Sequence, residues 1–273
     1  MTFVIRTFIK YLLLPLGVVY SLLFGPKDEV LMLMYHRVEN RVKKELAVSP
    51  QVFLWQMNYL HKKGLNVISM DEAYSMITRN GIKGRHVVLT FDDGYKDFYT
   101  NAYPILKKFG FPSIMFLCPG YIDTNKKYWW DQDEEQVKLM GWKDIYRLNK
   151  EGLVAFGSHT IEHADMDKLS MMEMEKELGG SQKLLEEKLG INIPHFAYPR
   201  GIYSKVGEDV LKKYYDTGVL TSNGKRVDKK CSTPDTHILK RIPVLKSDGR
   251  YLFVARLKGW LVVEDFIRKH LFS

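Results

Sequence analysis

The sequence has few cysteines and no internal repeat. Its two cysteines, Cys118 and Cys231, lie far apart, and neither belongs to a CxxC pair. This pattern gives no basis for a disulfide framework or a cysteine zinc site, and it leaves the redox compartment open. No segment is biased enough to look disordered, because hydrophobic residues make up 45% and charged residues 27% of the 273 positions. We therefore expect a globular protein whose residues 27–273 form one domain.

Long apolar runs are also missing. The apolar run at residues 11–24 has only 14 residues and contains Pro15, whereas a membrane span needs about 20. Arg6 and Lys10 precede this run, as basic residues do in signal peptides, but a small-x-small cleavage site is hard to find around residues 19–21. We expect residues 1–26 to form an uncleaved anchor or interfacial helix. A signal peptide and a core helix are the alternatives.

Positive charge exceeds negative charge along the chain. Lysine and arginine number 41 against 32 aspartates and glutamates, which gives a net charge of +9. An acidic glycan or an anionic membrane surface would suit this charge, whereas the sequence has no signature of nucleic-acid binding. If residues 1–26 lie on the inner membrane of a bacterium, Arg6 and Lys10 would face the head groups. The side chains expected to enter the lipid boundary are Phe3, Phe8, Leu12 and Leu13. Secretion is the alternative location.

From residue 30 onward, short apolar runs alternate with amphipathic stretches, which is the pattern of βα units around a parallel sheet. The expected strands are residues 30–35, 66–69, 86–91, 113–117, 153–156, 195–198, 217–220 and 238–244. Six to eight such units predict an α/β fold, a single-domain distorted (β/α) barrel. In barrels of this kind, chemistry gathers at the carboxyl ends of the strands.

Two carboxylates follow directly after one predicted strand. Residues 90–95 read TFDDGY, which places Asp92 and Asp93 at the end of the strand at residues 86–91. Adjacent strand residues point to opposite faces, so both carboxylates reach one site only if the chain turns there. Gly94 permits such a turn. Taken alone, the pattern also fits an ordinary surface turn.

Two histidines follow another predicted strand. His159 and His163 are four residues apart, which would place both imidazoles on one side of a helical turn. Alone, such a pair also fits packing or surface histidines. Two histidines and a carboxylate together are suited to bind a divalent metal and leave positions open for water and substrate.

These motifs resemble those of the polysaccharide deacetylase, or NodB-homology, family. The resemblance covers residues 30–245 and includes LMYHRV at residues 33–38 and FAYPRG at residues 196–201. It implies that Asp92 is the catalytic base. It also implies that Asp93, His159 and His163 bind a divalent metal, and their mixed nitrogen and oxygen donors favour zinc. The backbone N–H of Arg200 would then hold the oxyanion.

The segment FAYPRG at residues 196–201, which resembles the family's third motif, departs from the family pattern at two positions. Ala197 stands where many members have an arginine that orients the base, and Arg200 stands where many have a tyrosine. Arg241, at an inward position of the last predicted strand, is a candidate replacement for the missing guanidinium.

Members of the family usually carry the general acid in a histidine motif near the end of the domain, and this sequence offers only His237 there. His237 precedes its strand, which would place it at the wrong rim of the barrel. His36 stands at the end of the first strand and is the better candidate for protonating the leaving amine, although a buried histidine bonded to backbone is an equal alternative. Trp129 and Trp130 belong to an aromatic cluster at residues 128–131, which either contacts sugar or packs in the core or a lid.

Together these features predict a metal-dependent N-deacetylase acting on hexosamines of a bacterial envelope polysaccharide or a lipid-linked saccharide. A deformylase of a lipid-linked amino sugar would use the same chemistry. The remaining alternatives are a catalytically impaired glycan-binding protein of the same fold and a peptidase or other amidohydrolase.

Overall fold

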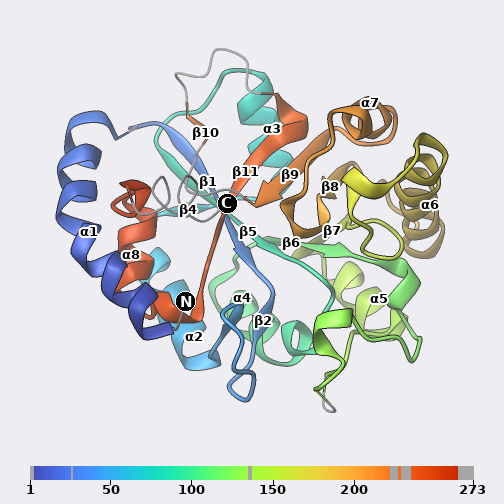
Figure 1. Cartoon of the computed structure of the whole chain (residues 1–273), viewed down its shortest axis with the longest axis horizontal. Coiled ribbons are helices and arrows are strands. Elements are labelled where there is room, and N and C mark those ends of the chain that lie inside the picture. Colours follow the sequence, from blue (N-terminus) through green and yellow to red (C-terminus); the bar gives the residue numbers. More distant parts are fainter. Residues whose placement is uncertain (1–2, 26, 135–136, 222–226, 229–234, 264–273) are drawn as a thin grey trace.

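The structure is a computed structural model and describes residues 3–25, 27–134, 137–221, 227–228 and 235–263. Its centre is a closed barrel of parallel strands, seen nearly end-on in Figure 1, in which β1 pairs with both β11 and β5. Around the ring the strands are β1 (Glu29–Tyr35), β11 (Leu239–Pro243), β9 (Thr217–Thr221), β8 (His195–Ala197), β7 (Val154–Ser158), β6 (Ser113–Leu117) and β5 (Arg85–Phe91). The predicted (β/α) barrel is confirmed.

Within the described residues, four short strands lie outside this ring. β4 (Asn66–Val67) pairs in parallel with β5, and β10 (Val227–Asp228) pairs antiparallel with β1. β2 (Arg37–Val38) and β3 (Ala47–Val48) form a separate small sheet just after β1. The predicted strand at residues 66–69 is therefore an outer strand, and β7 runs two residues further than predicted, to Ser158.

Helices surround the barrel, and serine side chains cap several of them. Ser49, Ser69 and Ser170 each accept a hydrogen bond from a backbone N–H of the following helix, which supplies a partner for a group that the first turn leaves unpaired. The helices are α2 (Pro50–Lys62), α3 (Met70–Thr78), α4 (Tyr103–Phe109), α5 (Trp142–Glu151), α6 (Met171–Leu189), α7 (Lys205–Tyr214) and α8 (Tyr251–Leu257), preceded by α1 (Phe3–Phe24).

Alternate residues of each strand belong to two separate parts of the core. In β1, Leu31 and Leu33 pack in a cluster with residues of the outer helices, whereas Val30 and Met32 pack with the inward residues of the other strands. Helix α3 adds side chains to the inner cluster and covers the end of the barrel where the strands begin. The opposite end, where the strands finish, is thus the end at which a site can open.

Helix α1 packs along the outside of the barrel beside α8 (Figure 1). Gly17 permits this close approach, since a Cβ there would lie 1.7 Å from the carbonyl oxygen of Trp260. Lys10 is buried and donates hydrogen bonds to Ser247 Oγ and Asp248 Oδ1 at 2.9 and 2.7 Å. The prediction that Lys10 faces lipid head groups is wrong, because its ammonium group lies inside the protein.

The outward face of α1 is apolar. The exposed large side chains on it are Phe8, Tyr11, Leu12, Leu16, Val19, Tyr20, Leu22, Leu23 and Phe24. Within the residues that the structure describes, no helix is both long enough and apolar enough to cross a bilayer.

Candidate active site

The site begins where β5 ends in a sharp turn. Asp93 and Gly94 have φ angles of 71° and 68°, which lie in the left-handed region. Such a conformation suits glycine and tolerates aspartate, and it reverses the chain so that Asp92 and Asp93 both face the barrel mouth. The turn is held by a hydrogen bond from Asp92 N–H to the carbonyl of Tyr35 and by one from Tyr128 OH to the carbonyl of Asp93.

The two histidines come from the loop that follows β7. The stretch between them does not form a helical turn, because the chain is irregular and His163 has a φ of 55°. His159 N–H donates to the carbonyl of Leu117 on the neighbouring strand, and His159 Nδ1 lies 2.7 Å from the carbonyl of Ala197. The Nδ1 contact requires the proton to be on that nitrogen, so Nε2 keeps a lone pair that is free to bind a metal.

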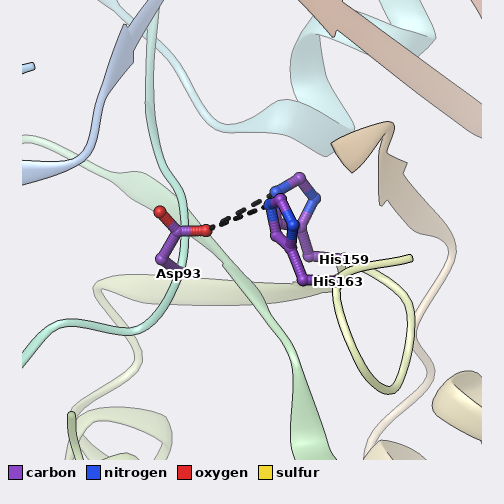
Figure 2. Close-up of side chains that lie close together, drawn as sticks. All are labelled: Asp93, His159 and His163. Carbon is purple, nitrogen blue, oxygen red and sulfur yellow. Dashed lines mark ion pairs between the residues drawn. The ribbon is translucent and has the colours of Figure 1, made fainter. Parts of the chain in front are cut away.

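Asp93, His159 and His163 converge on one point. The Nε2 atoms of both histidines lie 3.7 Å from Asp93 Oδ1, and Figure 2 shows the two rings side by side facing that oxygen. The three ligand atoms lie within 4.8 Å of one another. Two ligands about 2.0–2.2 Å from one zinc ion would lie roughly 3.3–3.6 Å apart in a tetrahedral site, which is close to the 3.7 Å between Asp93 Oδ1 and each Nε2.

The surroundings of these three residues also fit a metal ion. Asp93 Oδ1 is buried and has no hydrogen-bond partner among the described residues, which is costly for a carboxylate oxygen. Burial, followed by the charge of Asp92, raises the pKa of Asp93. Burial, followed by the nearby His159, lowers the pKa of His163 to about 3, so its imidazole is neutral at physiological pH. A divalent cation would satisfy all three groups at once.

Asp92 is held by Arg241. Two nitrogens of the guanidinium bond the two carboxylate oxygens at 2.6 and 2.8 Å, and both side chains are almost fully buried. Burial, the largest single cause, would raise the pKa of Asp92, but the charges of Arg241, His159 and His36 together outweigh it and lower the value to about 2. Arg241 therefore keeps Asp92 ionised and fixes its direction, and the prediction that it replaces the guanidinium absent at Ala197 agrees with this geometry.

His36 also lies beside Asp92. Its Nε2 is 3.9 Å from Asp92 Oδ2, and its buried Nδ1 has no hydrogen-bond partner among the described residues. Burial lowers the pKa of His36 to about 4, so it is neutral at rest. The following residue, Arg37, fixes the chain here, because its Nε donates to Asp97 at 2.8 Å.

Arg200 borders the same opening, whereas His237 does not. Arg200 lines the pocket and has a φ of 55°, and its half-exposed guanidinium pairs with Asp165 at 2.8 Å. His237 bonds the carbonyl of Tyr215 at 2.9 Å and is absent from the lining of the pocket within the described part of the chain. This position agrees with the expectation that His237 lies at the wrong rim.

A pocket of about 500 Å³ opens above these groups. The structure brings together in its lining all six predicted site residues, Asp92, Asp93, His36, His159, His163 and Arg200. Its wall also contains Trp129 and Trp130 from the predicted aromatic cluster. Cys118 is buried beside the site, and burial raises the pKa of its thiol.

A polar network in the pocket wall was not predicted from the sequence. Asp131 is fully buried and accepts hydrogen bonds from Lys44 Nζ and Tyr95 OH, while Trp130 Nε1 donates to Tyr95 OH at 2.9 Å. Lys44 lies 87 positions before Asp131, and no motif connects the two segments. The adjacency of Asp131 to the tryptophans was the one available signal.

Comparison with known proteins gives the family. The profile of the polysaccharide deacetylase family matches residues 79–218, which is more than half of the chain. YxkH of Bacillus subtilis, whose assigned name is that of a polysaccharide deacetylase, is 31% identical over 195 residues, covering 71% of this chain and 64% of YxkH. The poly-beta-1,6-N-acetyl-D-glucosamine N-deacetylase of Staphylococcus aureus strain MRSA252 is 24% identical over 256 residues, covering 86% of this chain and 83% of that protein.

Solved structures show the same fold. IcaB from Ammonifex degensii superposes with a TM-score of 0.71 at 24% identity, covering 85% of this chain and 98% of IcaB. The Streptococcus pyogenes deacetylase PplD, solved in complex with acetate, gives 0.72 at 24% identity, covering 85% and 99%. The chain belongs to the polysaccharide deacetylase, or NodB-homology, family.

Proposed function

We propose that this protein is a zinc-dependent hydrolase that removes N-acetyl groups from the hexosamines of a bacterial envelope glycan, either a polymer or a lipid-linked saccharide. The observation that carries the proposal is the convergence of Asp93, His159 and His163 beside the Arg241-held Asp92. The Staphylococcus aureus relative, named for deacetylation of an N-acetylglucosamine polymer, supports an N-acetylated glycan as substrate.

The residues of the site can be assigned to the successive steps of amide hydrolysis. A bound zinc ion would polarise the amide carbonyl and make a nearby water more acidic. Asp92 accepts the proton of the attacking water, since Arg241 keeps it ionised. The N–H of Arg200 stabilises the oxyanion that forms on the carbonyl oxygen. Cleavage of the C–N bond then yields acetate and a free amine.

The leaving nitrogen needs a proton, and His36 is our candidate donor. It is neutral at rest, and its Nε2 lies 3.9 Å from Asp92 Oδ2. A small movement would let His36 take up the proton that Asp92 removes from water and pass it to the amine. Substitution His36→Gln should therefore reduce kcat without loss of zinc, and unchanged kcat would assign the step to another group.

Release of acetate tests the proposal directly. The zinc-loaded protein is incubated with β-1,6-linked N-acetylglucosamine oligomers, peptidoglycan fragments and lipid-linked saccharides that carry N-acetyl or N-formyl groups, and acetate, formate and free amine are measured. Acetate with an equal amount of free amine supports the proposal. Formate alone would indicate a deformylase, and glycan binding without any turnover would indicate a binding protein.

Zinc binding is tested separately. The double variant His159→Ala, His163→Ala removes two of the three proposed ligands and should lose zinc in metal analysis of the purified protein. The matched control is His237→Ala, which removes a histidine outside the pocket. Equal zinc content in wild type and the double variant would contradict the metal site.

We also propose that α1, within residues 1–26, contacts a membrane surface, such as that of the bacterial inner membrane. The support is its row of exposed apolar side chains, together with a net charge of +9 that favours anionic lipids. Because the inner face of α1 packs on α8 through Leu14 and holds Lys10, deletion of the helix would expose buried groups. Point substitutions on the outer face are therefore the better test.

The measurement is flotation with vesicles of phosphatidylglycerol and phosphatidylcholine. Leu12→Glu and Leu16→Glu, at side chains 64% and 59% exposed, should reduce vesicle binding without lowering acetate release from a small substrate. Met172→Glu is the control, since Met172 is 83% exposed on α6, away from α1. Equal flotation of all variants would contradict membrane contact by α1.

A further inference from the structure

One aromatic side chain in the wall of the pocket is left open to solvent. Trp129 lines the pocket that contains Asp92 and Asp93, yet 69% of its surface is exposed. A large indole that stays in water does not contribute the stabilisation that its burial would give to the fold. An exposed tryptophan at the mouth of a site is therefore a candidate binding surface.

The neighbouring Trp130 is arranged differently. Its ring stacks on Tyr128 with an interplanar angle of 2° and meets the ring of His163 edge-on at 4.7 Å. Trp129 stands nearly perpendicular to Trp130, at 85° and 5.5 Å between ring centroids. Trp130 thus packs against a proposed metal ligand, and Trp129 continues the same aromatic wall outward from the reacting centre.

The turn that carries Trp129 is firmly held. The short helix η3 (Trp129–Asp131) ends at a buried carboxylate, Asp131, which accepts hydrogen bonds from Lys44 and Tyr95. Lys44 also donates to the carbonyl of Trp130 at 2.6 Å. A side chain on a fixed turn loses little conformational freedom when a ligand binds to it, so its exposed ring is pre-organised.

We propose that Trp129 forms a subsite for a second sugar ring of the glycan, adjacent to the hexosamine that is deacetylated. The apolar face of a pyranose would stack on the indole, and the polar side chain of Glu45, which lines the same pocket, would face its hydroxyl groups. This inference rests on the proposed deacetylase function. It adds that the enzyme selects oligomeric or polymeric substrates over a single acetylated sugar.

The test compares substrates of different length. Trp129→Ala should lower kcat/KM about 3- to 10-fold for β-1,6-linked N-acetylglucosamine oligomers of two or more sugars. The value for N-acetylglucosamine itself should not change, because one sugar occupies only the reacting position. Trp129→Tyr, which keeps an aromatic face, should recover most of the loss.

Tyr251→Ala is the matched control, since Tyr251 is an 82% exposed aromatic outside the pocket lining. An equal loss on the monosaccharide and the oligomers would show that Trp129 only supports the fold of the wall, and no loss on any substrate would also overturn the subsite. If wild type releases no acetate, the same oligomer series is titrated against the wild-type protein by calorimetry. Affinity that rises with length and falls in Trp129→Ala would then support the subsite even though the deacetylase proposal had failed.

Discussion

Asp92 and Asp248 are two buried carboxylates that differ in what surrounds them. Each is 2% exposed and each is held by an arginine, Arg241 for Asp92 and Arg256 for Asp248. Asp248 accepts two further hydrogen bonds, from Lys10 Nζ and from the backbone N–H of Leu245. Both of its oxygens are therefore fully engaged within the protein.

The surroundings of Asp92 are less complete. The neighbouring Asp93 Oδ1 and His36 Nδ1 are buried without hydrogen-bond partners in the described part of the chain, and a pocket opens beside them. Charge burial by itself thus does not identify a catalytic group. The difference lies in polar atoms that the fold leaves available for a metal, water or substrate.

The largest effect is expected at Asp92. Asp92→Asn keeps the size of the side chain but removes the proton acceptor, so acetate release should fall about 100- to 10,000-fold at saturating zinc. Zinc content should stay the same because the three ligands remain. Rates and zinc content are measured on the same preparations.

Asp93→Asn is the control for this prediction. It should weaken zinc affinity as well as the rate, since it replaces a proposed ligand with a neutral one. If Asp92→Asn lost zinc while Asp93→Asn kept it, the two roles would be reversed. Wild-type turnover by both variants would contradict the deacetylase proposal.

A smaller effect is expected at Arg241, a positioning residue. Arg241→Lys keeps the charge but loses the two-point contact with Asp92, and we expect kcat to fall about 10- to 100-fold with KM little changed. Arg241→Met should lower kcat further, because it leaves Asp92 buried without a cation. The same change should lower the free energy of unfolding by about 3–5 kcal/mol. If the Lys variant keeps full kcat, charge alone suffices and orientation by the guanidinium is unnecessary.

The sequence predicted the parts of this site that follow from strand ends. Asp92, His36 and the loop of His159 all come directly after barrel strands, and the rule that such ends share one rim places them together. Arg241 followed from its inward position on a strand. These inferences depended on local patterns read one segment at a time.

Other features depend on partners that are distant in sequence. Lys10 reads as a lipid-facing lysine in an apolar helix, but its partner Asp248 is 238 positions away. The hydrogen bond from Lys44 to Asp131 likewise joins two residues that lie 87 positions apart in the sequence. The loop that carries His163 is likewise irregular, and the N–H of His159 at its start bonds the carbonyl of Leu117 on a neighbouring strand, a contact that the spacing of the two histidines does not indicate.

The smallest effect is expected on stability, at Lys10. Lys10→Met should lower the free energy of unfolding by about 2 kcal/mol, because a buried charged hydrogen bond is lost while Arg256 still pairs with Asp248. The rate of acetate release per folded molecule should not change, since Lys10 lies outside the pocket lining. Urea unfolding at neutral pH measures the difference, and Lys107→Met, which removes an exposed ion pair with Glu151, should have little effect.

The pH dependence of this difference tests its cause. Burial raises the pKa of Asp248, but Arg256 and Lys10 outweigh burial and lower it below the ordinary value. The ionised carboxylate therefore stabilises the fold fully above about pH 4, where the unfolded group is ionised, and this contribution is lost as pH falls through the lower folded pKa. Without Lys10 that pKa rises, so the stability gap between wild type and Lys10→Met should narrow as the pH falls below about 4. A gap that stays constant from pH 7 to pH 3 would show that Lys10 acts through packing of its aliphatic chain rather than through its charge.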